Sequence, residues 1–118
     1  MADRQTIGKQ GEQAAAQYLS GAGYQIVATN WRCKAGEIDI VARQGETLVF
    51  VEVRSRLKPE DAFASVQHSK QVKMIRAAQL YLAETEQEEA AWRIDVIAVG
   101  RGRDGKPQIE HVEDALDW

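Results

Sequence analysis

"GEIDIVARQGETLVFVEVRSR", residues 36–56, is the stretch that decides the fold. Two runs of mostly β-branched and apolar residues flank a turn that contains glycine, which is the pattern of a β-hairpin. The same runs carry four charged residues, namely Glu37, Asp39, Glu52 and Arg54. A small domain needs its central strands for apolar packing, so charges on this hairpin require an explanation.

The length of 118 residues predicts one domain, residues 1–118, large enough to bury a core without disulfides. A hydrophobic content of 44% and a charged content of 28% are typical of a soluble globular protein. No apolar run approaches the roughly 20 residues that span a bilayer, and the N-terminus lacks the apolar core of a signal peptide. Cys33 is the only cysteine, which excludes an internal disulfide and a thiolate metal cluster. We therefore expect a cytoplasmic protein with no membrane partner.

Charge is unevenly distributed along the chain. Residues 1–83 hold 11 Lys/Arg against 8 Asp/Glu, whereas residues 84–118 hold 4 against 10. The formal net charge of −3 argues against non-specific coating of nucleic acid but is compatible with a local basic surface. The candidate nucleic-acid-binding residues are Arg32, Lys34, Arg56, Lys58, Lys70 and Arg76. For each of them a solvated charged face is the alternative.

Periodicity and turn signals predict a succession of helices and strands. The expected elements, in chain order, are a helix over 8–22, strands over 24–32, 36–43 and 47–54, a helix over 66–83, and strands over 92–100 and 108–112. The order αβββαββ predicts an α/β fold in which a mixed five-stranded sheet is flanked by helices.

The hairpin places its charges by strand alternation, because side chains two positions apart share a face of the sheet. Ile38 and Ile40 are then expected on one face and Asp39 on the other. A two-residue turn at 45–46 would place Asp39 opposite Glu52. A turn one residue earlier would still keep both carboxylates on one face, whereas a three-residue loop would separate them.

Two carboxylates in opposite positions suit a metal ion. Such positions bring Cβ atoms to about 4.5–5.5 Å, close enough for both side chains to hold one hard cation. Without a cation the two carboxylates would repel each other. We therefore expect a Mg²⁺ or Mn²⁺ site at Asp39 and Glu52. The alternative is an ion-pair network in which Glu37 faces Arg54 and neutralises part of the charge.

The first predicted helix adds a third acid to this group. Small and apolar residues recur on it at helical spacing, at Gly8, Gly11, Ala15, Leu19 and Ala22. Glu12 lies on the same stripe, which predicts that it packs against the sheet. Acids from one helix and two strands would form a site of oxygen ligands that stays partly open for substrate phosphate and water. The alternative for Glu12 is an exposed position at the edge of the helix.

Glu12 in an opening helix, Asp39 in "GEIDIVA" and "VEVR" at 51–54 together resemble the PD-(D/E)XK nuclease core. Over nearly its full length the chain is similar to the YraN-like family of small bacterial proteins, which is related in fold to archaeal Holliday junction resolvases. The resemblance implies a restriction-endonuclease-like fold, hydrolysis of branched or structured DNA in repair, and a homodimer. It also implies that Asp39 and Glu52 bind the metal, that the Val53 carbonyl is a third ligand, and that Glu12 completes the shell through water.

The chain departs from the family pattern at Arg54, where the pattern has lysine. A guanidinium stays charged and cannot act as a base, although it can stabilise the charge of a phosphoryl transition state. Lys70 or Lys73 on the following helix could supply the missing ammonium, with a solvated helix face as the alternative for both. Two functions therefore remain open: a weakly active metal-dependent nuclease, or a catalytically lapsed module that binds nucleic acid or a repair partner.

The remaining polar residues carry weaker signals. His68 and His111 have no second histidine or cysteine at metal-site spacing and are expected at the surface. Asp95 lies in a predicted strand and is expected to pair with a nearby arginine. The segment "GRGRDG" at 100–105 lacks the strand and helix that flank a phosphate-binding loop, so a turn is expected there.

Overall fold

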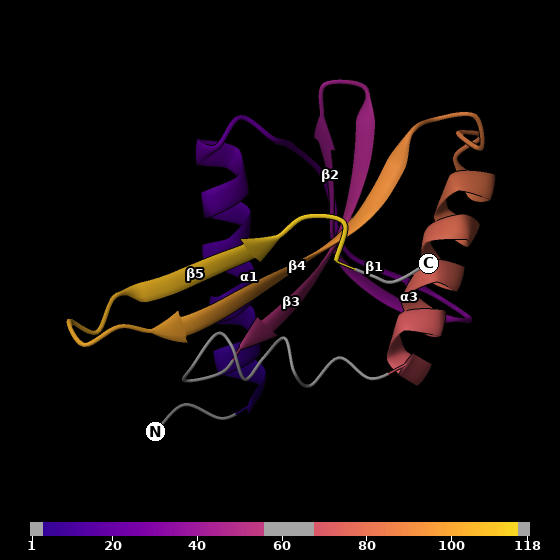
Figure 1. Ribbon diagram of the computed structural model, residues 1–118. Coiled ribbons are helices and arrows are strands. Elements are labelled where there is room, and N and C mark those ends of the chain that lie inside the picture. The colour runs from indigo at the N-terminus through magenta and orange to yellow at the C-terminus, as the bar shows by residue number, and fades with distance from the viewer. Residues whose placement is uncertain (1–3, 56–67, 116–118) are drawn as a thin grey trace.

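The computed structural model describes residues 4–55 and 68–115 (Figure 1). Its elements are α1 (Arg4–Gly21), β1 (Gln25–Cys33), β2 (Gly36–Gln44), β3 (Thr47–Ser55), α3 (His68–Glu84), β4 (Trp92–Arg101) and β5 (Pro107–Val112). The predicted order αβββαββ is confirmed. The expected boundaries are close to the observed ones except at α1, which begins four residues earlier than predicted.

The strands form one mixed sheet in the order β1-β2-β3-β4-β5. β3 and β4 are parallel, and every other neighbouring pair is antiparallel. Parallel neighbours need a crossover connection, and here that connection contains α3. The predicted mixed five-stranded sheet is therefore confirmed.

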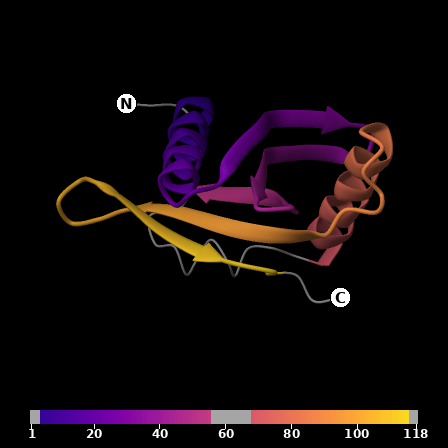
Figure 2. The ribbon, with the colours of Figure 1, turned by 90° about the horizontal axis from the view of Figure 1, so that it is seen from above.

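The two helices lie on opposite faces of the sheet (Figure 2). Beneath α1 the core consists mainly of Ala15, Leu19, Ile40, Ala42, Val49, Val51 and Ile97. Beneath α3 it consists mainly of Val41, Leu48, Phe50, Met74, Ala78, Tyr81 and Ile94. Each inner strand thus contributes alternate residues to the two cores, which explains why β2, β3 and β4 are apolar on both faces.

The hairpin between β2 and β3 has the two-residue turn that the sequence predicts. Paired residues run from Gln44 opposite Thr47 at the turn to Ile40 opposite Val51. Gly45 has a φ of 61°, a left-handed conformation that glycine adopts without a steric cost. The next position on each strand beyond the last pair belongs to an acidic residue.

The expectation that Ile38 and Ile40 share a face is wrong. Ile38 packs in the core under α3, whereas Ile40 packs in the core under α1, so β2 turns over at Asp39. On β1, Asn30 lies between the residues paired with Ile38 and Ile40. Asn30 has a φ of 53°, and a left-handed residue interrupts the regular alternation of paired strands. Asp39 therefore lies at the position where the side chains of β2 switch from one face of the sheet to the other.

Candidate metal site

Asp39 and Glu52 form the centre of the candidate site. Asp39 Oδ2 accepts a hydrogen bond of 2.8 Å from the backbone N–H of Val53, and the Glu52 carboxyl group is close enough to raise the pKa of Asp39. Glu52 is buried, with 6% of its surface exposed, and Asp39 is partly buried.

The pKa of Asp39 reflects its burial and the acidic groups around it. Burial raises the pKa of Asp39 to about 8, and the Glu52 and Glu12 carboxylates act in the same direction. The hydrogen bond from Val53 acts against them. A carboxylate that is costly as a free anion becomes favourable beside a cation, which displaces the proton. The donor chemistry of Asp39 and Glu52 therefore fits a hard divalent ion.

Glu12 of α1 lies near this pair from the other side of the sheet. Burial raises the pKa of Glu12, a hydrogen bond with the Asn30 side chain lowers it, and the Glu37 and Glu52 carboxylates raise it. Glu12 is partly buried, which lies between the expected packing against the sheet and the exposed alternative. Asn30 was not predicted as a site residue from the sequence. The one available signal was an asparagine, a residue that tolerates positive φ, inside a predicted strand.

Gly11 allows α1 to come this close to β3. A Cβ atom on Gly11 would overlap Ser55 Oγ and would lie 3.9 Å from Val53 Cγ1. One and two turns later, Ala15 and Leu19 are fully buried against the sheet. The small residue thereby brings its neighbour Glu12 to the end of β3, as the helical stripe predicts.

Two cationic side chains contact Glu52. Arg54 Nε lies 3.6 Å and Lys70 Nζ 3.4 Å from Glu52 Oε1. Arg54 Nε is buried and has no hydrogen-bond partner in the described part of the chain. Lys73 is exposed and forms no ion pair with any described residue. The structure therefore separates the two lysines that the sequence left equivalent, because only Lys70 reaches the acidic pair.

The ion pair between Glu37 and Arg54, the alternative to a metal site, does not form among the described residues. Glu37 Oε1 lies instead 3.8 Å from Arg32 Nε, and the two side chains are 37% and 82% exposed. A pair this exposed contributes little to stability.

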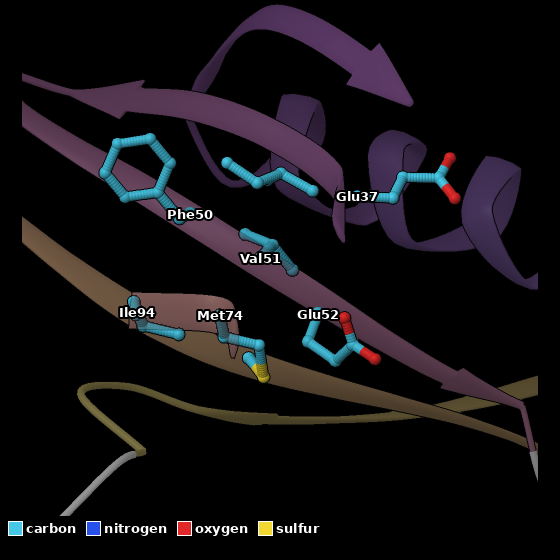
Figure 3. A pocket seen from close by; sticks show the side chains of 7 residues that line it. Glu37, Phe50, Val51, Glu52, Met74 and Ile94 are labelled. Atoms are coloured by element: carbon cyan, nitrogen blue, oxygen red, sulfur yellow. The ribbon is translucent and has the colours of Figure 1, made fainter. Parts of the chain in front are cut away.

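A shallow pocket lies on the α3 side of the sheet and ends at Glu52 (Figure 3). Its lining residues are Glu37, Ile38, Phe50, Val51, Glu52, Met74 and Ile94. The two acids occupy one end and Phe50 and Ile94 the other. The pocket is largely open to solvent and its water-accessible volume is only about 10 Å³, whereas small-molecule sites enclose roughly 300–1,000 Å³. The arrangement suits one group of a larger ligand lying on the surface.

The predicted metal ligands other than Asp39 and Glu52 are a backbone carbonyl and a water molecule. Within residues 4–55 and 68–115, no three His, Cys, Asp or Glu side chains are gathered so that they could hold a metal ion. An ion at Asp39 and Glu52 would thus need other oxygen donors. The Val53 carbonyl and a water held by Glu12 stay the predicted ones.

The predicted nucleic-acid-binding residues fall into three groups. Arg32, Lys34 and Arg76 are exposed. Lys70 is 44% exposed and belongs to the acidic site. Arg56 and Lys58 lie outside the described residues.

His111 is not at the surface, and this prediction is corrected. Only 8% of its side chain is exposed, and Nε2 lies 2.7 Å from Oδ2 of the fully buried Asp95. The Tyr18 hydroxyl lies 3.1 Å from His111 Nδ1. Arg93 Nε donates to Asp95 at 3.0 Å, which confirms the expected arginine partner. The side chain of His68 lies outside the described residues.

This buried network joins β4, β5 and α1 on the face of the sheet opposite to Glu52. Asp95 lies on the same side of β4 as Ile97, in the core under α1, whereas Glu52 lies on the same side of β3 as Phe50. The network is therefore separate from the candidate metal site. No helix among the described residues is both long and apolar enough to cross a membrane.

Comparison with known proteins gives one family match. The profile of the uncharacterised protein family UPF0102 matches residues 11–99, a range that contains Glu12, Asp39 and Glu52. A UPF0102 protein of Geotalea daltonii is 44% identical over 119 residues, covering 98% of this chain and 92% of that protein. A UPF0102 protein of Chloroflexus aurantiacus is 46% identical over 97 residues, covering 81% and 80%. Among solved structures, that of Pyrococcus furiosus SfsA in complex with Ca²⁺ matches with a TM-score of 0.40 and 14% identity, over 94% of this chain and 64% of that chain.

Proposed function

This chain belongs to the uncharacterised protein family UPF0102, and we propose that it is a metal-dependent nuclease of the PD-(D/E)XK type that hydrolyses phosphodiester bonds in DNA. The observation that carries the proposal is the buried pair of Asp39 and Glu52. Two cations, Arg54 and Lys70, contact Glu52, whereas three carboxyl groups, those of Asp39, Glu52 and Glu12, lie close enough to affect one another. Structural ion pairs balance their charges with fixed partners, whereas this group keeps an excess of carboxyl groups that a divalent ion would neutralise.

Asp39 and Glu52 would hold Mg²⁺ or Mn²⁺ directly, with the Val53 carbonyl and Glu12, through water, as further donors. When bound, such an ion polarises a phosphate oxygen and lowers the pKa of coordinated water. Glu52 would keep its orientation through its contacts with Arg54 and Lys70. The Asp39 carboxylate would keep its own through the hydrogen bond from Val53.

The two cations have different roles in this proposal. The Arg54 guanidinium has a buried Nε with no hydrogen-bond partner in the described part of the chain and stabilises negative charge that develops on the phosphate. Lys70 is partly exposed, so its ammonium can orient the attacking water and exchange a proton with solvent. Water forms the new bond to phosphorus, the bond to the leaving oxygen breaks, and that oxygen receives a proton.

A polymer fits the site better than a small molecule. The pocket beside Glu52 is small and open, and exposed basic residues lie on α3 and at the end of β1. Branched or structured DNA, a role in repair and a homodimer follow from the resemblance to junction resolvases. Two symmetric cuts at a junction need two copies of the site, so light scattering that shows a monomer at working concentration would contradict the junction version.

A second candidate function rests on Arg54 itself. An arginine cannot take the proton of the attacking water, so activity lapses if Lys70 does not replace the missing lysine. The chain would then bind metal and DNA, or a repair partner, without cutting. Both candidates require the metal site and differ only in turnover.

Calorimetric titration with Mn²⁺ tests the metal site. We expect saturable binding to the wild type and a loss of affinity of about 10–100-fold or more in Glu52→Gln and Asp39→Asn. Glu110→Gln removes an exposed acid on β5 and is the matched control, which should bind as the wild type does. Binding that persists in Glu52→Gln would contradict both candidate functions.

A panel of linear, flapped and four-way DNA substrates with Mg²⁺ and Mn²⁺ separates the two candidates. Weak cleavage by the wild type that is lost in Arg54→Ala at near-native Mn²⁺ affinity supports the nuclease. Cleavage that appears only in Arg54→Lys supports the lapsed module. A gain of roughly two to four decades is expected from a restored acid–base group. If neither protein cleaves any substrate, only the binding function remains as a candidate.

A further inference from the structure

The hairpin of β4 and β5 forms an arm that extends past the candidate site. β4 runs parallel to β3, with Ser55 beside Val99, and continues to Arg101 before the chain turns. Figures 1 and 2 show this turn projecting at one end of the molecule, with α3 at the other end and β3 between them. The arm therefore points in the direction in which β3 carries Glu52 and Arg54.

The turn of the arm, residues 101–106, is basic and unpaired. Arg101, Arg103 and Lys106 are all exposed, and none forms an ion pair with a residue of the described part of the chain. Asp104 is the one acid in the turn, and its Oδ1 accepts a hydrogen bond of 3.0 Å from the backbone N–H of Lys106. Asp104 is thus hydrogen-bonded within the turn, and the side chains of Arg101, Arg103 and Lys106 stay accessible to a ligand.

This concentration of positive charge contrasts with its surroundings in the sequence. Residues 84–118 contain 10 acidic and 4 basic residues, and three of those four lie in the turn. The fourth, Arg93, is paired with the buried Asp95. The most acidic third of the chain therefore places its available positive charge at the end of one arm.

The turn is also held in one shape by its backbone. The N–H of Gly102 donates to the Lys106 carbonyl at 2.9 Å, and the N–H of Gly105 donates to the Gly102 carbonyl at 3.0 Å. Gly105 has a φ of 78°, which a residue with a side chain rarely adopts. A preformed turn loses little conformational entropy when it binds.

We infer that this arm binds the sugar-phosphate backbone of a nucleic acid duplex that extends beyond the Asp39–Glu52 site. The inference rests on the proposed function, because it adds a second contact to the same substrate. Glu52 lies beside Val96, and Arg101 is five residues further along β4, so the arm begins ~17 Å from the level of Glu52. At 3.4 Å per nucleotide along the axis of a duplex, that is about five base pairs.

The overall dimensions agree with a short duplex. The molecule measures 43 Å along its longest axis, which corresponds to about 13 base pairs. α3, with the exposed Lys73 and Arg76, lies at the end opposite to the arm (Figure 1). The basic residues at the two ends would contact two stretches of the phosphate backbone. The acidic site between them would hold one phosphate through the metal ion.

The main alternative role for these charges is protection of an edge. β5 is an edge strand of the sheet, and charged residues near such strands prevent pairing with a second copy. Removing the charges would then promote self-association and leave binding of nucleic acid unchanged. The two roles differ in measurable ways.

The test is fluorescence anisotropy of a labelled 24-base-pair DNA duplex in EDTA, over a range of KCl concentrations. Arg101→Gln/Arg103→Gln/Lys106→Gln should bind about 10-fold or more weakly than the wild type. The slope of log affinity against log salt should fall by about 2–3, since each lost phosphate contact removes about 0.9. On a 10-base-pair duplex the two proteins should differ much less.

The matched control is Arg101→Lys/Arg103→Lys, which keeps the charge and should bind within about twofold of the wild type, because a phosphate backbone is read mainly as charge. Wild-type affinity and slope in the triple variant, or no binding by the wild type, would overturn the inference. Self-association of the triple variant with unchanged binding would overturn it in favour of edge protection. If the triple variant melts early by circular dichroism, Arg103→Glu replaces it with the same expected loss.

Cleavage assays keep this inference distinguishable from the proposed function. If the arm variant loses binding while the wild type cuts no substrate with Mn²⁺, the role of the arm in binding is supported and the proposed hydrolysis is contradicted. If the wild type cuts and the arm variant binds and cuts equally well, hydrolysis is supported and the role of the arm is contradicted.

Discussion

The carboxylate of Asp39 on β2 accepts a 2.8 Å hydrogen bond from the backbone N–H of Val53, the residue that follows Glu52 on β3. Regular backbone pairing of β2 with β3 ends at Ile40 opposite Val51, just before Asp39 and Glu52. Beyond that pair, the Asp39 side chain and not a backbone carbonyl of β2 accepts the hydrogen bond from Val53. The bond holds the two carboxyl groups side by side, so the candidate site is built into the end of a core hairpin.

The two lysines of α3 offer the sharpest test of catalysis. Lys70 Nζ lies 3.4 Å from Glu52, whereas Lys73 is exposed and forms no ion pair with a described residue. We expect Lys70→Ala to lower any DNA cleavage by roughly two to four decades, the range of acid–base assistance. Lys73→Ala, on the same helix and with the same change in charge, should cleave at close to the wild-type rate. Equal losses in both variants would instead indicate a general electrostatic effect.

Asp39 should make the metal-free protein less stable at high pH. Burial and the neighbouring acids raise the pKa of Asp39 to about 8, above about 3.9 in the unfolded chain. A group with a raised folded-state pKa stabilises the fold below its unfolded value, and this contribution is lost as the pH rises through the folded value. Urea unfolding in EDTA should therefore show a free energy of unfolding that falls between about pH 4 and pH 8.

Asp39→Asn is the control for this pH dependence, because an amide stays neutral throughout. The variant should be less sensitive to pH over the same range. Saturating Mn²⁺ should reverse the trend in the wild type, because a cation favours the carboxylate. Identical pH profiles for wild type and variant would rule out Asp39 as the titrating group.

Asp95 should act in the opposite sense. Burial alone would raise the pKa of Asp95, but hydrogen bonds from His111, Arg93 and the Asp114 backbone outweigh it and lower the pKa. Its stabilisation is thus present above the unfolded value of about 3.9 and is lost as the pH falls towards the folded value. Asp95→Asn removes the fully buried charge that faces Arg93 and His111 and should cost about 3–5 kcal/mol at pH 7.

Urea unfolding at several pH values checks the Asp95 prediction. The difference between wild type and Asp95→Asn should shrink as the pH is lowered from 7 to about 3. Glu110→Gln on the exposed face of β5 should stay within about 0.5 kcal/mol of the wild type. A difference that does not change with pH would indicate lost packing and not lost charge.

Gly11 and Ser55 should be coupled. Alanine at position 11 favours the helix by about 1 kcal/mol over glycine, but its Cβ would overlap Ser55 Oγ. We expect Gly11→Ala to be neutral or destabilising alone and stabilising by about 1 kcal/mol in the Ser55→Ala background. A double-mutant cycle of thermal or urea unfolding measures the coupling. Additive effects would show that α1 does not depend on this close approach.

The order of the elements and the core hairpin were predictable from local pattern. Alternation of apolar residues, a glycine at the turn and the positions of Asp39 and Glu52 together specify a hairpin with two acids on neighbouring strands. Those features depend on residues close together in the chain. Their geometry follows from the two-residue period of a strand, so they need no knowledge of distant partners.

Three features depended instead on contacts between distant segments. The spacing of Lys70 and Lys73 is compatible with either one facing Glu52, and the rotation of α3 is set by packing of Met74, Ala78 and Tyr81 against the sheet. His111 is buried because β5 pairs with β4 beside Asp95, which lies 16 residues away. The turn of β2 at Asp39 lies beside Asn30 of a neighbouring strand, which has a left-handed conformation. In each case side chains that the sequence leaves equivalent are distinguished by the way helices and strands pack, because packing is a property of the whole core.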